Sequence, residues 1–239
     1  MTPSPSKGER VGVRGRTSSA LESGQPLTLA LSPLAQGEGI SSSMERAARN
    51  AITARGRFTC ALTGGTAATT LYPRLATADL DWSRIDFFLS DERCVPHDHP
   101  DSNYRVLRAA LPRARLHAVN THLPPEQAAA DYARQLPDQL DLIHLGMGPD
   151  GHVASLFPGH PLLHETQLRV AALTDSPKPP SARVTFTLPT LTSARELWFL
   201  VLGAAKRPAA DEARTDPHSL LPAALVQRGA AHTTWFTDF

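Results

Sequence analysis

Short apolar segments that alternate with helical segments constrain the fold of this chain more than any other feature. The most apolar of them, Leu197–Leu202, reads Leu-Trp-Phe-Leu-Val-Leu. Comparable or weaker strand-like runs occur at 58–62, 85–89, 116–119, 142–145, 169–173, 183–188 and 233–236, and helical segments at 44–55, 66–76, 102–111, 125–136, 204–214 and 219–227. Apolar strands that alternate with helices are buried on both faces. The pattern therefore predicts an α/β fold: a single Rossmann-like domain with a mostly parallel sheet flanked by helices on both faces.

Residues 1–43 differ in character from the rest of the chain. They are rich in Ser, Gly, Pro and Thr and show no amphipathic period, so they are expected to be disordered or to be a spurious extension. Met44 is then the expected native start, and residues 44–239 are expected to form the folded domain. A basic stretch precedes Leu27–Leu31, but this apolar core is too short for a signal peptide and Pro33 follows it.

Composition excludes several classes of protein. A net charge of +1 gives no support for binding to nucleic acid or to an anionic membrane, and no run approaches the roughly 18 apolar residues of a membrane span. Cys60 and Cys94 lie in or beside apolar runs, which favours buried free thiols over a disulfide and fits a reducing cytoplasm. The ten histidines form no metal-binding motif, so no protein-built metal site is expected.

The segment Gly146–Gly159 carries the strongest chemical signal. It reads Gly-Met-Gly-Pro-Asp-Gly-His-Val-Ala-Ser-Leu-Phe-Pro-Gly and directly follows the apolar run at 142–145. Ligands of α/β proteins bind beyond the carboxyl ends of the strands. A histidine titrates near neutral pH, so His152 at this place is a candidate general base with Asp150 as its partner. The alternative is an ordinary turn with a surface histidine.

A second turn, Thr63-Gly64-Gly65-Thr66, lies between a strand and a helix. Backbone N–H groups and two hydroxyls in such a turn suit an anion, although many Gly-Gly turns bind nothing. Three cations lie at strand ends and could converge on it: Arg93, Arg183 and Lys206. Each of them is, taken alone, more often a solvated surface charge.

Several familiar motifs are missing from the sequence. There is no Gly-x-Ser-x-Gly elbow, which disfavours an α/β serine hydrolase. The phosphate-binding loop of ATP enzymes and the Gly-x-Gly-x-x-Gly fingerprint of dinucleotide enzymes are also absent. ATP and NAD are therefore unsupported, and no organic cofactor is expected.

Taken together, these motifs resemble the 6-phosphogluconolactonase family, in the wider group that includes glucosamine-6-phosphate deaminase. The resemblance covers most of residues 44–239 in the family's order. It rests on Thr63–Thr66 with Leu71-Tyr72, Asp91–Pro96 with Asp101–Tyr104, Gly146–Gly159, Arg183–Thr185, and Gly203 with Lys206. Deaminases follow Asp-Gly-His with an Asn-Glu-Pro pattern, and no acid stands at that place in this chain.

The resemblance implies hydrolysis of 6-phospho-D-glucono-1,5-lactone to 6-phosphogluconate, in the oxidative pentose phosphate pathway. It implies that His152 activates a water, that Asp150 orients it, and that Arg93 or the backbone N–H groups of residues 146–151 stabilise the oxyanion. Thr63–Thr66, Arg183 and Lys206 would hold the 6-phosphate. The expected partner is a small sugar phosphate, for a cytoplasmic monomer or weak homo-oligomer without nucleic acid, membrane, metal or cofactor.

Two alternatives stay open at this point. One is a deaminase or isomerase on the same fold, and the other is a non-catalytic sugar-phosphate-binding homologue. The chain also departs from the family's usual Ser-Gly-Gly-Ser-Thr-Pro at Ala67 and Ala68, and has Val153 where a threonine is usual. These changes are expected to weaken phosphate affinity. The family's first strand has no clear counterpart before Met44, so one edge of the sheet is expected to be missing or irregular.

Overall fold

A parallel sheet forms the centre of the molecule. The computed structural model describes residues 27–30 and 33–239, and within these residues seven strands form a sheet in the order β1-β10-β9-β6-β2-β3-β5. All neighbouring strands of this sheet run parallel. The strands are β1 (Leu27–Ala30), β2 (Phe58–Leu62), β3 (Ile85–Leu89), β5 (Arg115–Leu116), β6 (Leu142–Gly146), β9 (Glu196–Val201) and β10 (Thr233–Thr237). The predicted α/β fold with its parallel sheet is confirmed.

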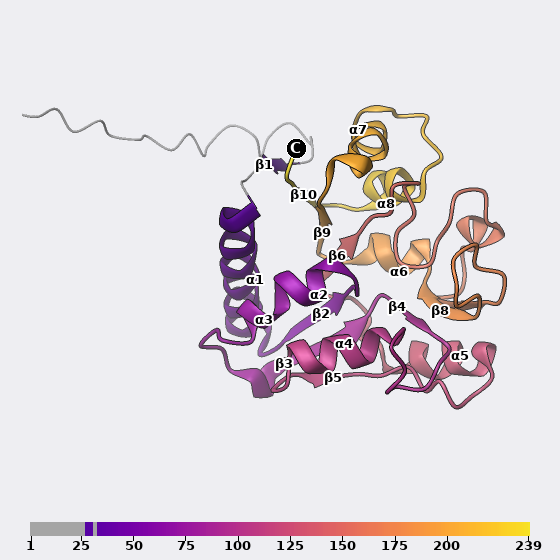
Figure 1. The fold of residues 1–239 in the computed structure, drawn as a ribbon. Coiled ribbons are helices and arrows are strands. Elements are labelled where there is room, and N and C mark those ends of the chain that lie inside the picture. Colours follow the sequence, from indigo (N-terminus) through magenta and orange to yellow (C-terminus); the bar gives the residue numbers. More distant parts are fainter. Residues whose placement is uncertain (1–26, 31–32) are drawn as a thin grey trace, which may run out of the picture.

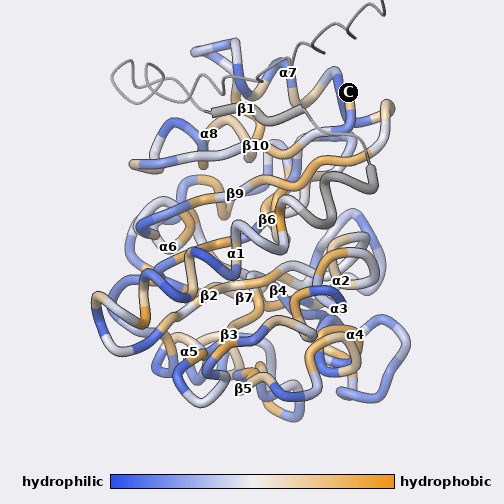
Figure 2. Tube along the Cα trace, turned by 90° about the vertical axis from the view of Figure 1, so that its left-hand side faces the viewer, coloured by the Kyte–Doolittle hydropathy of each residue, from blue (hydrophilic) through white to orange (hydrophobic). Residues whose placement is uncertain are grey.

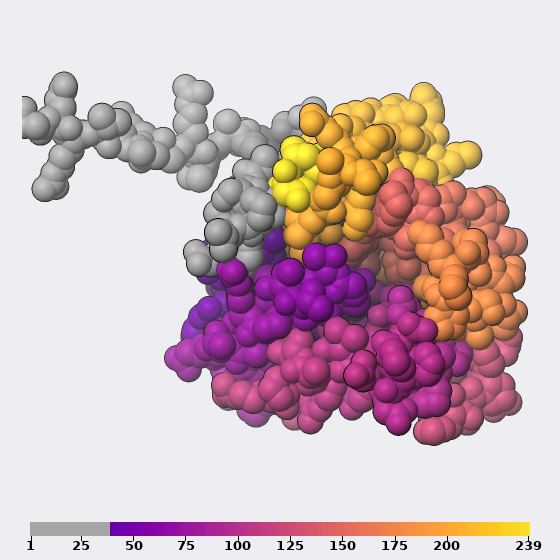
Figure 3. Space-filling view, viewed as in Figure 1, coloured from indigo at the N-terminus to yellow at the C-terminus, as the bar shows by residue number. Residues whose placement is uncertain are grey.

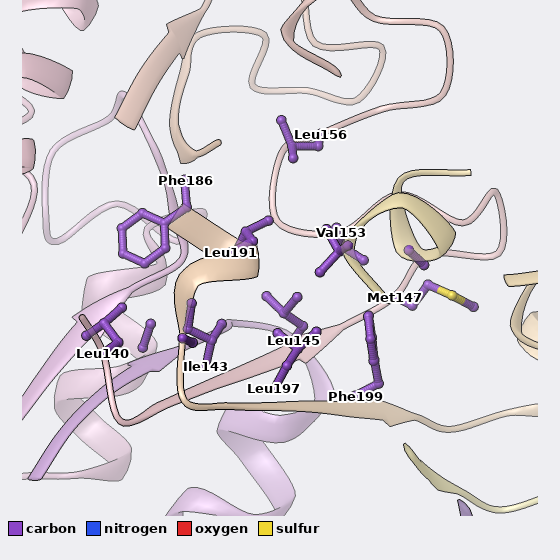
Figure 4. Packing of buried hydrophobic residues seen from close by; sticks show 14 of the residues in the cluster. Leu140, Ile143, Leu145, Met147, Val153, Leu156, Phe186, Leu191, Leu197 and Phe199 are labelled. Atoms are coloured by element: carbon purple, nitrogen blue, oxygen red, sulfur yellow. The ribbon is translucent and has the colours of Figure 1, made fainter. Parts of the chain in front are cut away.

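The strands are apolar throughout because each one contributes to two cores. Successive side chains of a strand point to opposite faces of the sheet. On β2, Cys60 packs into one core and Ala61 into the other, and on β9 Leu200 and Phe199 divide in the same way. Figure 4 shows the second core from close by, with Leu145 of β6 beside Phe199. Because the sheet is buried on both faces, its strands do not alternate apolar and polar residues as half-exposed strands do.

Helices cover both faces of the sheet (Figures 1 and 2). One face is packed by α1 (Pro33–Arg55), α2 (Thr66–Thr70), α3 (Tyr72–Leu75) and α4 (Asn103–Ala110), and the other by α5 (Pro125–Gln135), α6 (Leu188–Ser193), α7 (Arg207–Thr215) and α8 (Pro222–Gly229). Local sequence sets several helix ends. Ser102 caps α4 by accepting from Arg105 N–H at 3.2 Å, and Gly56 ends α1 at a φ of 81°. None of the described helices is long and apolar enough to cross a membrane.

A second, smaller sheet lies beside α5. It joins β4 (Asp91–Arg93), β8 (Arg183–Phe186) and β7 (Val170–Leu173) in antiparallel pairs. The expected runs at 169–173 and 183–188 are strands, but they belong to this sheet, and residues 91–93 form its third strand. In its register Arg93 stands opposite Arg183. The small sheet therefore places two of the three candidate cations next to each other.

The amino-terminal part of the fold differs from the expectation. The helix expected at 44–55 begins at Pro33, and β1 lies inside the segment that was expected to be disordered. β1 pairs with β10 over four residues, so it is the edge strand for which the sequence offered no clear counterpart. Its partner is about 200 residues away, which explains why the local pattern did not reveal it. Residues 1–26 and 31–32 lie outside the described residues, and Met44 as the native start stays a prediction.

The two thiols are both free, as expected. Cys60 is fully buried in β2, and burial raises its pKa well above the usual value. Cys94 is only half-buried, so the expectation of burial holds for one of the two. Burial, with the charges of Glu92 and Glu126, raises the pKa of Cys94 to about 11, which makes it a poor nucleophile at neutral pH.

Removal of residues 1–43 is expected to destabilise the protein. It deletes β1 and the first turns of α1, including Ile40, whose side chain is 1% exposed. Loss of one buried isoleucine and of an edge ladder should lower the free energy of unfolding by at least about 2 kcal/mol. Urea unfolding of the shortened chain measures this. The control lacks only residues 1–26, and equal midpoints for the two chains would contradict the role of β1 and Ile40.

Candidate active site

A small polar cavity lies beyond the carboxyl ends of the central strands. Its volume is about 250 Å³, which suits a small metabolite. The lining comes from the segments after β2, β6 and β9, from β4 and β8, and from the first residue of α4. β2 and β6 are neighbours, and the strand order reverses direction between them, which is where open α/β sheets bind ligands. In Figure 3 the violet surface that includes α2 lies beside the orange and gold surface of the last third of the chain.

The glycine turn after β6 brings His152 back to the strand end. Gly148 N–H donates to the His152 carbonyl at 2.9 Å, and Gly151 N–H donates to the Gly148 carbonyl at 3.0 Å. A Cβ on Gly148 would lie 2.0 Å from His152 Nδ1, so this position requires glycine. Because both N–H groups are already bonded within the turn, neither is available to an oxyanion. Two of the backbone donors considered from the sequence are thereby excluded.

Asp150 and His152 form a hydrogen-bonded pair. Asp150 Oδ1 lies 2.5 Å from His152 Nδ1, so the carboxylate accepts from Nδ1 and leaves Nε2 for a ligand. Burial lowers the pKa of His152 below its ordinary 6.5; the Asp150 charge opposes this shift, and the charge of Lys178 adds to it. Burial raises the pKa of Asp150, but the hydrogen bonds and charges of His152 and Lys178 outweigh it and lower the pKa to about 2. At neutral pH the pair is therefore a carboxylate and a neutral imidazole.

The loop after β2 lines the same cavity through Thr63, Gly64, Gly65 and Thr66. A Cβ on Gly64 would lie 2.1 Å from Asn103 Oδ1, so the backbone passes close to the start of α4. Gly65 has a φ of 68°, which glycine adopts without strain. The loop thus presents its backbone and two hydroxyls to the cavity.

Tyr72, a buried tyrosine, is hydrogen-bonded to the loop at 63–66. Thr63 N–H donates to Tyr72 Oη at 3.3 Å, and Tyr72 Oη lies 2.8 Å from Nδ1 of His144 on β6. Burial lowers the pKa of His144 to about 4, so its imidazole is neutral and accepts the tyrosine proton. Tyr72 therefore connects the loop to the central strand. In the sequence Tyr72 is only part of a family motif, and its role becomes visible in the fold.

Arg93 lines the cavity, but the acids beside it have other partners. Its Nη1 donates to the Asp101 carbonyl at 2.5 Å. Glu92 is fully buried and accepts from the backbone N–H groups of Arg93, Asn103 and Tyr104. Its bonds therefore organise the start of α4.

Asp91 is the acid that faces the cavity. Its Oδ2 accepts from Ser155 Oγ at 2.7 Å, and its Oδ1 accepts from Asn103 Nδ2 at 3.3 Å. Arg183 Nη1 lies 4.0 Å from the same carboxylate and donates to Ser155 Oγ at 3.3 Å. Because Arg93 and Arg183 stand opposite each other in the small sheet, Asp91 offsets part of the repulsion between them.

Lys206 also lines the cavity. It ends a 3₁₀ turn (Ala204–Lys206) that begins at Gly203, where φ is 98° and the N–H donates to Asp238 Oδ1 at 2.8 Å. Burial lowers the pKa of Lys206, and the Asp238 carboxylate opposes the shift. Among the described residues no protein group hydrogen-bonds its Nζ, so this ammonium is available to an anion.

The structure brings the sequence-derived candidates into one place. All of them except Asp150 line the cavity, and Asp150 bonds to His152. Val153 points into the apolar core (Figure 4), so this departure from the family pattern does not alter the cavity wall, whereas Ala67 does line it. In the described part of the chain no three His, Cys, Asp or Glu side chains gather as metal ligands would. Lys178, which contacts both Asp150 and His152, gave no sequence signal because it lies in a proline-rich loop 26 residues away.

Comparison with known proteins assigns the chain a family. Residues 35–235 match the family described as glucosamine-6-phosphate isomerases/6-phosphogluconolactonase. A probable chloroplastic 6-phosphogluconolactonase 3 of Oryza sativa subsp. indica is 38% identical over 229 residues, which cover 84% of this chain and 70% of the rice protein. The 6-phosphogluconolactonase of Homo sapiens is 40% identical over 214 residues, covering 81% of this chain and 83% of the human protein.

Solved structures agree with the sequence relatives. The crystal structure of 6-phosphogluconolactonase from Thermotoga maritima superposes with a TM-score of 0.81 at 34% identity, covering 89% of this chain and 99% of that one. The enzyme from Trypanosoma brucei superposes with a TM-score of 0.79 at 27% identity, covering 89% and 95%. The shared fold therefore extends over nearly the whole described chain.

Replacement of Tyr72 by Phe is expected to destabilise the loop at 63–66. It leaves Thr63 N–H and His144 Nδ1 without their partner, and unpaired polar groups in buried surroundings cost about 1–3 kcal/mol. Urea unfolding should show this loss, and calorimetry should show weaker binding of inorganic phosphate. Tyr104→Phe is the control, since no hydrogen bond of the Tyr104 hydroxyl is found among the described residues. If both variants behaved like the parent, the supporting role of Tyr72 would be wrong.

Proposed function

The chain belongs to the family of glucosamine-6-phosphate isomerases and 6-phosphogluconolactonases, and on that premise we propose that it hydrolyses 6-phospho-D-glucono-1,5-lactone to 6-phosphogluconate. The relatives cited above carry the name 6-phosphogluconolactonase, and at 38–40% identity they support the same reaction here. The observation that carries the proposal is the position of His152. Its imidazole lines the cavity and is held through Nδ1 by Asp150. Thr63, Thr66 and Lys206 line the same cavity.

The proposed chemistry begins with a water molecule near Nε2 of His152. The neutral imidazole takes a proton from this water as its oxygen attacks C1 of the lactone. The carbonyl oxygen becomes an oxyanion in the tetrahedral intermediate. Collapse of that intermediate breaks the bond between C1 and the ring oxygen, and the imidazolium returns the proton to the ring oxygen as it leaves. The products are a C5 hydroxyl and a carboxylic acid, which ionises.

Arg93 is the proposed donor to the oxyanion. It lines the same cavity as His152, and the turn N–H groups of Gly148 and Gly151 are already bonded. A cation aimed at the developing negative charge stabilises the transition state more than the substrate. Asp150 keeps the ring in one tautomer and stabilises the imidazolium that forms.

The 6-phosphate is proposed to bind at the other end of the cavity. Gly64, Gly65 and Thr66 offer backbone N–H groups there, Thr63 and Thr66 offer hydroxyls, and Lys206 offers an ammonium group. Arg183 adds positive charge from the wall. Most of its N–H groups are bonded to protein, so it is proposed to attract the phosphate by charge more than by direct hydrogen bonds.

The residue before Pro158 favours this reaction over sugar-phosphate isomerisation or deamination. Phe157 stands directly before Pro158, where the deaminase pattern has a glutamate, and it is buried with its ring 4.9 Å from the His152 ring. No carboxylate is therefore supplied from this position for ring opening.

The expected cytoplasmic location and the monomeric or weakly oligomeric state stay predictions, and the rice relative is named as chloroplastic.

The full chain should hydrolyse 6-phospho-D-glucono-1,5-lactone faster than the spontaneous background, and His152→Ala should lower kcat by at least about 100-fold because the base is lost. The assay couples 6-phosphogluconate formation to its dehydrogenase, with the uncatalysed rate subtracted. His122→Ala, which removes an exposed histidine outside the cavity, is the control. Equal rates for His152→Ala and the parent would show that the base is misassigned. Release of ammonia from glucosamine 6-phosphate would show that the protein is a deaminase and would contradict the proposed reaction.

The pH dependence of kcat/KM should show an acidic limb below pH 6.5. Burial lowers the pKa of His152 below that ordinary value, so the catalytically competent neutral imidazole is complete at pH 7 and is lost as the pH falls. Initial rates between pH 5 and 8, corrected for spontaneous hydrolysis at each pH, measure this limb. A limb centred above pH 7 would mean that another group titrates.

A further inference from the structure

Lys178 touches the proposed base and its partner at once. Its Nζ lies 3.1 Å from Asp150 Oδ2 and 3.1 Å from His152 Nδ1. It comes from the segment between β7 and β8 and is not among the residues that line the cavity. Neither the family resemblance nor the proposed mechanism assigns this residue a role.

The segment that carries Lys178 is held in place by a buried guanidinium. Arg183, whose side chain is 5% exposed, donates from Nη2 to the Lys178 carbonyl at 2.8 Å and from Nε to the Pro180 carbonyl at 2.9 Å. Ser176 Oγ also donates to the Lys178 carbonyl at 2.8 Å. These bonds fix the backbone at Lys178 and so hold its ammonium group beside Asp150.

An aromatic ring completes the arrangement. The ring of Phe157 lies 5.9 Å from Lys178 Nζ and 5.7 Å from the Arg183 guanidinium carbon, and it contacts the His152 ring. A cation over an aromatic face is attracted by the electrons of the ring. Phe157 therefore lies next to the imidazole and to both cations.

Nδ1–H of His152 and Nζ–H of Lys178 are both donors, so they cannot bond to each other and must share the Asp150 carboxylate. We propose that Lys178 is a positioning residue for His152: its ammonium group holds Asp150 against Nδ1–H and, by its charge, opposes protonation of the imidazole. The proposal rests on the proposed function, in which His152 must be neutral before it takes a proton from water. Once the imidazolium has formed, repulsion by the nearby ammonium favours return of the proton to the ring oxygen.

The charges around His152 decide the sign of the effect. Asp150 from the same turn and Asp91 from β4 favour the protonated imidazole, whereas Lys178 and burial disfavour it. Arg183 lies across the Phe157 ring and adds positive charge, and Lys206 is close enough to Lys178 for their charges to interact. Removal of the Lys178 charge therefore leaves two carboxylates facing His152 and raises its pKa.

The test compares Lys178→Met, Lys178→Arg and the parent in the full chain. NMR follows the imidazole resonances from pH 4 to 8, with the His152→Gln spectrum to assign His152. The Lys178 side chain is 41% exposed, so screening by water limits the expected upward shift in Lys178→Met to about half a pH unit. Lys178→Arg should return the pKa to that of the parent. Arg134→Gln, which removes a 71% exposed charge on α5, is the control and should show no shift.

The same variants are then assayed on the lactone. Lys178→Met should move the acidic limb of kcat/KM upward by the shift seen in NMR and should lower kcat, with KM changed less. A fall in kcat with an unmoved His152 titration would overturn the proposal and leave only a structural role. The titration needs no turnover, so a parent that fails to hydrolyse the lactone would refute the proposed function while Lys178 is still judged by the NMR shift.

Discussion

The position of β6 in the middle of the sheet is the constraint on which the site depends. β6 pairs with β2 on one side and β9 on the other, all three parallel, so the segments that follow them leave the sheet at the same edge. Those segments carry Thr63–Thr66, the glycine turn with His152, and Lys206. Burial of β6 on both faces holds the register, because a slip of one residue would exchange Ile143 and His144 between the two cores.

The distribution of cations around the cavity follows from how each one is held. Lys206 is half-buried and offers its ammonium group directly, whereas Arg183 is buried and bonds to backbone carbonyls and to Ser155. Phe157 lies under Arg183 and Lys178. The Ser155–Phe157 segment, which distinguishes this chain from the deaminase pattern, therefore also organises the positive side of the site. Its hydroxyl connects Asp91 to Arg183, and its aromatic ring supports the two cations.

Much of the fold and of the candidate site could be predicted from the sequence. The strands at 58–62 and 85–89 have the predicted bounds, and the helix predicted at 102–111 is α4, which Ser102 caps. These features depend on local pattern and capping chemistry. β1 and the small antiparallel sheet could not be predicted, because each depends on pairing between distant segments: Leu27–Ala30 with β10, and Asp91–Arg93 with β8.

The sequence by itself determined the parallel α/β class, the glycine turns that need small residues, and the residue types that a lactone-hydrolysing site requires. These are properties of short segments, set by periodicity, backbone freedom and side-chain chemistry. Only the tertiary structure decided which groups act on one another. It placed Arg93 opposite Arg183, connected Tyr72 to the loop at Thr63, and brought Lys178 to within 3.1 Å of His152. Electrostatic and hydrogen-bond energies depend on distance and burial, and folding sets both for residues that lie far apart in the chain.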